Sequence, residues 1–396
     1  MNPVFVSQDT TPEFEQQVRN AMIRLLEEQI PCEISARTLN DARLWEILCH
    51  AATKRGYLEG TCAELRDAPS GNTVREHLHQ AFADNPAARA QLEEQLNQAL
   101  KQQLPPRLLR DLRRRCWEAA GDWHEVPFHG QVAEAEVEVR GSQPKAGTTR
   151  FHTYATLALI NKGRRVSLAL TIVRKGERMV QIVQRLLDRA RHLGVRLKLT
   201  YWDKAFGTIE VMRHLRARRV PYIIALAQRG QNGIKRLCGG RESYHTPYTF
   251  QSAAAGRYTT EVVIACKYSR KRYRKPGCRY FAYAVYRIGA RSPLQVAAAY
   301  RRRFSIESGY RQVEQVRART RTRNHTLRLL LFGIAILLVN LYVLLRRTCG
   351  ILTSYGSRIR LIPLSLDQMV SDLRRYIQGV LGVNSVTQHR PCPVLS

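Results

Sequence analysis

The chain has 396 residues, of which 44% are hydrophobic, and this composition predicts a globular protein with a large core and excludes a disordered one. Its 64 Lys and Arg outnumber 32 Asp and Glu, giving a net charge of +32. The surplus is uneven, because residues 1–100 carry a net −6 and the remainder a net +38. Such a field attracts polyanions, so DNA or RNA is the expected partner.

Residues 13–110 show apolar side chains at helical spacing, which predicts an all-helical N-terminal region. Within it, residues 61–82 contain two short helices around a Pro-Ser-Gly-Asn break. This layout suits a helix-turn-helix, with Thr73, Arg75, Glu76 and His77 on the part that would enter a major groove. An ordinary helical hairpin stays open as the alternative.

From residue 117 the period changes to that of strands. Two strands joined by a turn at residues 161–163 precede a helix over 177–194, a strand ending at Asp203, a further helix and a strand over 220–227. This order predicts a mixed sheet covered by helices. Residues 229–289 are rich in tyrosine and strand-like, with a basic turn, and we interpret them as a β-rich insertion. Helices over 292–315 and 327–347 follow.

The second of these helices is apolar enough to reach the lower limit of a membrane span. A helix buried on all sides in a large α/β core has the same composition. We favour the core helix and expect no membrane partner, because a single span fits poorly with a polyanion-binding body. The nine cysteines include no C-x-x-C pair, which indicates reduced thiols in a cytosolic protein. Residues 1–17 contain neither the basic nor the apolar region of a secretory signal, so we expect no signal peptide there.

Three carboxylates are the candidates for chemistry. Asp122 lies where the sheet begins, Asp203 closes an apolar strand, and Glu307 lies on a predicted helix inside an arginine-rich segment. Carboxylates at the carboxyl ends of adjacent strands converge where α/β sheets bind ligands. Oxygen ligands suit Mg²⁺ or Mn²⁺, and two such ions can serve an in-line displacement at phosphorus. For Glu307 the alternative is an ion pair on a solvated helix face. His124 and His129 could be metal ligands, but we prefer to interpret them as polar residues at a strand end.

Three motifs carry a resemblance to a known family. They are "GDWHEVPFHG" at Asp122, "YWDKAFG" at Asp203 and "YRRRFSIESGYR", which contains Tyr300, Arg303 and Glu307. Together they resemble the DDE transposases of prokaryotic insertion sequences, in the group with a Y-x-x-R-x-x-x-E signature. The similarity runs from residue 122 to about residue 347.

The resemblance implies an α/β fold: an RNase H-like mixed sheet flanked by helices, with a β-rich insertion and an N-terminal all-helical domain. The expected domains are residues 1–112, helical; 113–228, first part of the catalytic core; 229–290, basic β-rich insertion; 291–348, closing helices with the glutamate; and 349–396, a C-terminal tail.

The resemblance also implies cleavage and strand transfer of DNA at the ends of an insertion sequence. Asp122, Asp203 and Glu307 would be the catalytic residues and would bind two Mg²⁺ or Mn²⁺ ions. The protein would act in the cytoplasm, associated with the nucleoid, as a homodimer on the element's terminal inverted repeats and on target DNA. The expected DNA-binding residues are Tyr300, Arg303, Arg311, Arg317, Arg270, Lys271, Arg272 and Arg274.

The sequence departs from the family pattern at two places. The lysine expected seven residues after the glutamate is Glu314, so the phosphate contact would fall to Arg311 or Arg317. No tryptophan lies in the insertion, and Tyr268 or Tyr273 is the candidate for stacking a base. A non-catalytic or domesticated DNA-binding protein, whose carboxylates form structural ion pairs, is the alternative function.

Overall fold

The computed structural model describes residues 4–6, 11–133, 136–161, 164–228, 233–269, 277–346, 349–355 and 358–384. For residues 4–6, 11, 161, 164, 269, 304–307, 349–355 and 358–362 it describes the backbone alone. Contacts divide the chain into two compact units. We call Leu104–Tyr310 the sheet unit, and Met1–Gln103 with Arg311–Ser396 the helical unit.

The sheet unit is built on a nine-stranded mixed sheet. Its five central strands lie in the order β7-β6-β4-β8-β9, and β6 alone runs against the other four. They are β7 (Arg164–Val173), β6 (Thr148–Asn161), β4 (Cys116–Pro127), β8 (Arg196–Trp202) and β9 (Tyr222–Ala225). This is the mixed α/β sheet that the sequence predicts.

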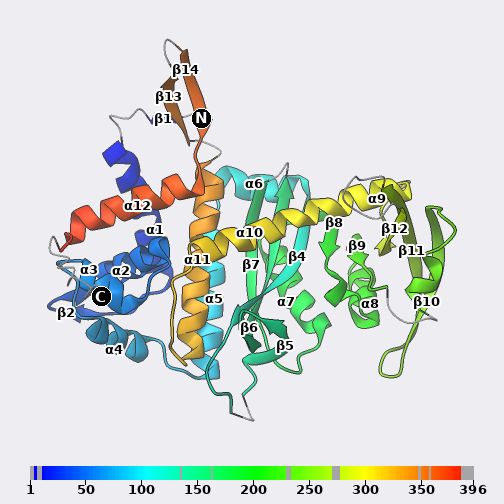
Figure 1. Cartoon of the computed structure of the whole chain (residues 1–396), viewed down its shortest axis with the longest axis horizontal. Helices are drawn as coiled ribbons and strands as arrows, with labels where there is room; N and C mark the ends of the chain where they lie inside the picture. The colour runs from blue at the N-terminus through cyan, green and yellow to red at the C-terminus, as the bar shows by residue number, and fades with distance from the viewer. Residues whose placement is uncertain are drawn as a thin grey trace, which may run out of the picture. The chain divides into compact units, whose positions relative to one another are not determined.

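The inserted strands extend this sheet beyond β9. They are β10 (Tyr244–Ser252), β11 (Gly256–Ser269) and β12 (Gly277–Tyr286), and β12 pairs antiparallel with β9. At the other side β5 (Val139–Lys145) pairs with the start of β6. The prediction of a β-rich segment after β9 therefore agrees with the described strands, which continue the central sheet (Figure 1).

Helices cover the sheet because each carries one apolar stripe. On α7 (Met179–His192) the buried residues are Ile182, Val183, Leu186, Leu187 and Ala190, the face that the helical spacing predicts. This helix packs against β6, β7 and α8 (Ile209–Ala217), while α6 (Pro106–Arg114) contacts β4 and β8. Strand β6, at the centre of this arrangement, is buried over residues 151–160.

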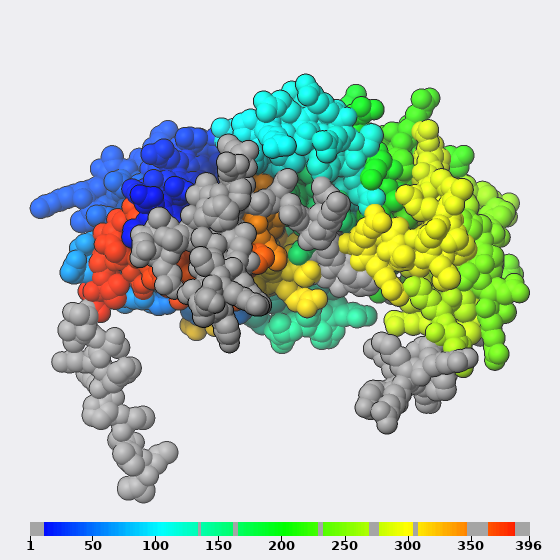
Figure 2. Space-filling view, turned by 90° about the horizontal axis from the view of Figure 1, so that it is seen from above, coloured from blue at the N-terminus to red at the C-terminus, as the bar shows by residue number. Residues whose placement is uncertain are grey.

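The segment over residues 293–315 differs from the single helix predicted for it. It consists of α9 (Pro293–Tyr300), a 3₁₀ turn (Arg301–Arg303) and α10 (Phe304–Gln315). Residues three apart nearly eclipse in a 3₁₀ turn, which brings Arg303 over Tyr300. Figure 2 shows α9 and its neighbours (yellow) at the surface beside the inserted strands (yellow-green).

The helical unit contains seven α-helices within the described residues. They are α1 (Thr11–Gln29), α2 (Asp41–Lys54), α3 (Leu58–Glu64), α4 (Gly71–Ala81), α5 (Pro86–Gln102), α11 (His325–Leu345) and α12 (Leu366–Leu381). Two short strands, β2 (Ser35–Ala36) and β3 (Leu39–Asn40), precede α2, and a small sheet joins β1 (Val4–Val6), β13 (Cys349–Tyr355) and β14 (Arg358–Pro363). The predicted C-terminal tail, residues 349–396, thus includes α12, which packs against α1 and α2.

Helix α11 is the one described helix that is long and apolar enough to cross a membrane, and 83% of its most apolar window is buried. It packs against α5 and α2, and Gly333 gives Leu96 of α5 the space that a Cβ would fill. This is the packing of a core helix, as the sequence favoured. The domain boundaries given above remain predictions, since the compact units divide the chain inside α10.

Candidate active site

Asp122 and Asp203 lie level with each other on two adjacent parallel strands, Asp122 within β4 and Asp203 directly after the carboxyl end of β8. Strand β4 pairs with β8 so that Gly121 is opposite Trp202, and the residue after each is one of the two aspartates. Asp122 is 6% exposed and lies opposite Thr156 of β6. The two aspartates therefore lie close together as predicted, although Asp122 lies within β4 and not at its carboxyl end.

One guanidinium joins the two carboxylates. Arg303 donates from Nη1 to Oδ2 of Asp122 at 2.6 Å and from Nη2 to Oδ1 of Asp203 at 3.1 Å. The Arg303 side chain is 7% exposed, against 9% for Asp122 and 25% for Asp203. Breaking such a pair by removing one partner is costly because it leaves a buried charge uncompensated.

Tyr300 orients Arg303 from the turn before it. Its hydroxyl accepts a hydrogen bond from Nε of Arg303 at 2.9 Å and donates to the carbonyl oxygen of Trp202 at 3.3 Å. The tyrosine ring is buried and packs on Tyr283 with 4.9 Å between centroids. Three donor directions of the guanidinium are thus fixed before any substrate arrives.

Tyr310 closes the other side of Asp122. Its hydroxyl donates to the backbone carbonyl of Asp122 at 3.0 Å and lies 2.8 Å from Oγ1 of Thr156. The ring stacks on His124 at 4.8 Å. The sequence analysis missed Tyr310, although its position seven residues after Arg303 places it on the same helical side. His124 is therefore a packing partner of Tyr310, and no cluster of three metal-ligating side chains occurs among the described residues.

Burial changes the acidity of Asp122. Loss of solvent raises the pKa of this carboxyl to about 6, and nearby Asp203 adds to the rise, while Arg303 and the Trp123 amide oppose it. Burial alone would lower the pKa of Arg303, but Asp122, Tyr300 and Asp203 together outweigh burial and raise the pKa overall. The guanidinium stays charged, and Asp122 titrates closer to neutral pH than an ordinary aspartate does.

The third predicted carboxylate, Glu307, lies on α10 one helical turn after Arg303, but its side chain is outside the described part of the structure. Arg311 is exposed on the same helix. Arg317 is paired with Glu314 at 2.8 Å and is 17% exposed. Of the two arginines expected to replace the missing lysine, Arg317 is thus already engaged by the residue at the lysine position.

Comparison with known families identifies the family of this chain. The family described as Transposase DDE domain matches residues 118–341, more than half of the chain. This chain belongs to the DDE transposase family. None of the curated proteins matches it significantly.

A solved structure extends the comparison of this DDE transposase to its fold. A piggyBac transposase, solved by cryo-electron microscopy as a synaptic complex with hairpin DNA, is similar with a TM-score of 0.53. The two chains are 10% identical, and the match covers 95% of this chain and 81% of the other. At this identity the likeness concerns the fold alone.

The oxygen donors of this transposase fit a divalent cation. Asp122 and Asp203 both bind one cationic group, so their oxygens already converge on a single positive charge. Carboxylate oxygens are the ligands that Mg²⁺ and Mn²⁺ prefer. The pair is therefore a chemically suitable place for the metal ions that the family implies.

Several predicted DNA-binding residues cannot be compared with the structure. Arg270, Lys271, Arg272 and Arg274 lie outside the described residues, in the connection between β11 and β12, as does Tyr273. The other stacking candidate, Tyr268, is 60% exposed near the end of β11. Tyr300 and Arg303 are buried and bonded within the site, so any direct contact of theirs with DNA stays a prediction.

The helix-turn-helix candidate corresponds to α3 and α4. Ser70 caps α4 by accepting from the Thr73 amide at 3.1 Å, so Thr73 lies in the first turn of this helix. Arg75 is exposed but bonded to Glu59 at 2.8 Å. Both the helix-turn-helix and the plain hairpin remain consistent with this arrangement, and a role of α4 in DNA binding stays a prediction.

Gly121 makes room for the indole beneath Asp122. A Cβ at this position would overlap the ring of Trp202, which is fully buried and donates from Nε1 to Thr200 at 2.9 Å. We expect Gly121→Ala to lower the free energy of unfolding by about 1–3 kcal/mol, as overpacked cores do. Urea denaturation checks this, with Gly141→Ala as the control, because nothing lies within 4 Å of a Cβ there. Equal stability of the two variants would contradict the packing role.

Proposed function

We propose that this chain is the transposase of a prokaryotic insertion sequence, which cleaves DNA at the ends of its element and joins the freed 3′-hydroxyl to target DNA. The observation that carries the proposal is the convergence of Asp122 and Asp203 on one guanidinium beside the carboxyl end of β8. Family membership and the Y-x-x-R-x-x-x-E segment around Glu307 support it.

In this mechanism Asp122, Asp203 and Glu307 would hold two Mg²⁺ or Mn²⁺ ions. Bound there, the ions would supply Lewis-acid activation of the attacking oxygen and stabilisation of the leaving oxygen in an in-line displacement. The residues of the chain do the positioning: Tyr310 and the Trp123 amide hold Asp122, and Tyr300 holds Arg303. Arg303, with Arg311, would then position the scissile phosphodiester.

The substrate would be duplex DNA with the element's terminal inverted repeats, bound by a homodimer in the cytoplasm at the nucleoid. The net charge of +32 supports a polyanionic substrate. The test is a nicking and strand-transfer assay on duplexes that carry the sequences flanking this gene, with Mg²⁺ or Mn²⁺. Metal-dependent cleavage at the repeat ends is the expected result, and intact DNA under all conditions would argue against the proposal.

A second candidate function has one specific observation in its favour. Arg303 already neutralises both aspartates, as it would in a DNA-binding protein that keeps the fold as a scaffold and no longer cleaves. The same assay separates the two, because a scaffold would bind the duplex without metal-dependent nicking. Substitution of either aspartate would then affect stability alone.

A further inference from the structure

Residues 316–324 connect α10 to α11 and carry alternating arginines. We call them the arginine strap. Arg319, Arg321 and Arg323 are exposed, whereas Val316, Ala318 and Asn324 are buried. Alternate residues of an extended chain are about 6.6 Å apart along the backbone, so the three exposed arginines recur at short, regular intervals along the strap.

The strap is fixed although it belongs to no helix or strand. At its beginning, the Arg319 amide donates to the carbonyl of Gly56 at 2.9 Å. At its end, Nδ2 of Asn324 donates to the carbonyl of Phe82 at 2.8 Å, and Oδ1 caps the first turn of α11. Between them, Arg328 donates to the carbonyl of Thr322 at 2.8 Å. The arginines are therefore presented by a preorganised backbone within the helical unit.

Of the four arginines in the strap, Arg317 pairs with Glu314, whereas the three exposed ones have no carboxylate partner among the described residues. Arg321 lies over the ring of Tyr57 at 5.3 Å, which orients its guanidinium without neutralising it. Three like charges within a Debye length of one another repel and collect counterions. The strap is thus a row of uncompensated cations on a unit whose first 100 residues carry a net negative charge.

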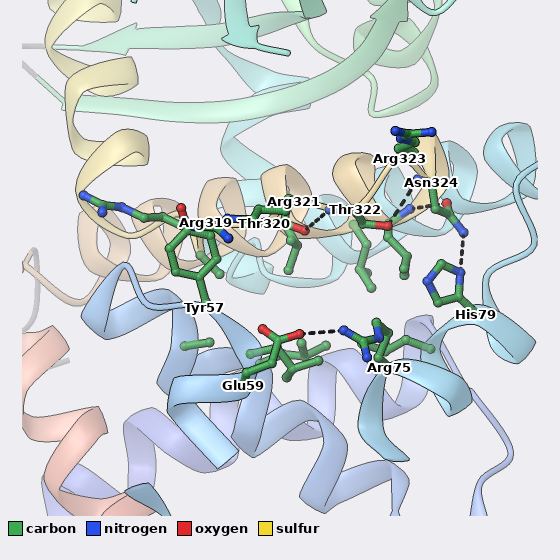
Figure 3. Close-up of a pocket in the computed structure, with 18 of the residues that line it drawn as sticks. Tyr57, Glu59, Arg75, His79, Arg319, Thr320, Arg321, Thr322, Arg323 and Asn324 are labelled. Atoms are coloured by element: carbon green, nitrogen blue, oxygen red, sulfur yellow. Dashed lines mark hydrogen bonds and ion pairs between the residues drawn. The ribbon is translucent and has the colours of Figure 1, made fainter. Parts of the chain in front are cut away.

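A cavity of about 860 Å³ separates the strap from α3 and α4. Figure 3 shows residues 319–324 along one side, with Tyr57, Glu59, Arg75 and His79 opposite. Thr320 and Thr322 face the cavity, while Arg323 points away from it. All three arginines border this cavity, and Arg321 extends over Tyr57 on its opposite side, so the strap presents charge both beside the cavity and away from it.

We propose that Arg319, Arg321 and Arg323 form a phosphate ladder that binds successive phosphodiesters along one strand of DNA. Guanidinium groups bind phosphate oxygens through paired hydrogen bonds, and the spacing of alternate residues is comparable with the step between neighbouring phosphates. A linear row of single charges matches a linear polyanion better than a compact acidic site. This inference rests on the proposed function in assuming DNA as the partner, and it adds a binding element in the unit without Asp122 and Asp203.

The test measures the salt dependence of DNA binding. Full-length wild type and the variant Arg319→Gln/Arg321→Gln/Arg323→Gln are titrated with a fluorescent duplex of random sequence from about 50 to 200 mM salt, and anisotropy gives the affinity. If each arginine neutralises one phosphate, the slope of log K against log salt becomes shallower by about 2.7 in the triple variant, because each contact contributes about 0.9. An unchanged slope would overturn the proposal.

Two controls separate the ladder from general charge and from folding. Arg37 is exposed in the same unit, off the strap, and Arg37→Gln removes one charge as each single strap variant does. We expect a slope change of about 0.9 for Arg321→Gln and none for Arg37→Gln. The triple Arg→Lys variant keeps the charges and is expected to keep the slope. Loss of binding in the triple Gln and triple Lys variants alike, with a lowered melting temperature, would mean that the strap is structural and would overturn the proposal.

The ladder and the proposed catalysis fail independently. A strap variant that binds like wild type, in a protein whose Asp203→Asn variant no longer nicks DNA, would refute the ladder and leave the transposase proposal intact. Conversely, a lost salt slope in a protein that never cleaves would support the ladder on a non-catalytic DNA-binding protein.

Discussion

Asp203→Asn is expected to lower metal-dependent nicking by about 10³-fold or more and to leave DNA affinity unchanged. A ligand to a catalytic divalent ion supports several kcal/mol of transition-state stabilisation, and each 1.4 kcal/mol is about tenfold in rate. The amide of asparagine keeps the size of the side chain and can still meet Arg303, but it removes the negative charge. Asp122→Asn should behave in the same way, since both carboxylates serve the same cationic group.

The measurement is single-turnover nicking of the repeat-end duplex, together with anisotropy for binding. Asp188→Asn is the matched control, because Asp188 is paired with Arg218 on the surface of the same unit and is 37% exposed. It should nick at the wild-type rate. If Asp203→Asn nicks as fast as Asp188→Asn, the aspartate pair is a structural ion pair and the scaffold alternative holds.

The convergence of the aspartates was predictable from sequence, and its central contact was not. Asp203 follows the end of β8, as the sequence predicts, whereas Asp122 lies within β4 and is level with Asp203 because Gly121 pairs with Trp202. The role of Arg303 depends on a 3₁₀ turn that interrupts an otherwise helical pattern, and such local winding leaves little trace in apolar spacing. Its partner Asp122 is 181 residues away in the chain.

Tertiary contacts also determine the environment of a helix where the spacing of its apolar residues does not. The apolar segment of α11 was ambiguous by composition, and its packing against α5 and α2 resolves it as a core helix of the helical unit. Helix α12 has an amphipathic stripe that pattern reading could have found, with Met369, Leu373 and Ile377 buried at helical spacing. The arginine strap had no detectable structure in the sequence, because its extended form depends on anchors at Gly56 and Phe82.

Arg303→Gln is expected to make the metal-free protein less stable and its stability more responsive to Mn²⁺. Arg303 provides the positive charge shared by Asp122 and Asp203. Its removal leaves two carboxylates facing each other in a buried site, at a cost of up to about 3–5 kcal/mol. A domain of this size loses roughly 2–4 °C in melting temperature per kcal/mol. Divalent cation should then restore more of the melting temperature in the variant than it adds to the wild type.

The loss of stability in Arg303→Gln should also depend on pH, and the titration of Asp122 sets the direction of that dependence. Burial raises the pKa of Asp122 from 3.8 to about 6, and Arg303 opposes that rise, so the pKa climbs further in the variant. A raised pKa means that the folded state favours the protonated carboxyl. The contribution of this carboxyl to the free energy of unfolding is therefore present at low pH and is lost as the pH rises through the pKa of the folded state. The melting deficit of Arg303→Gln should therefore be small near pH 5 and grow above about pH 6.

Arg302→Gln is the control for these measurements, because it removes the neighbouring guanidinium from the same 3₁₀ turn. Arg302 pairs with Glu118 at 2.8 Å and is 57% exposed, so its loss should leave the response to Mn²⁺ unchanged. Arg303→Lys is informative as well, since one ammonium cannot reproduce the two parallel bonds to Asp122 and Asp203. If Mn²⁺ raises the melting temperatures of wild type, Arg302→Gln and Arg303→Gln equally, Arg303 does not compete with the cation. The guanidinium would then be a lasting part of the site, which any metal ion would have to share.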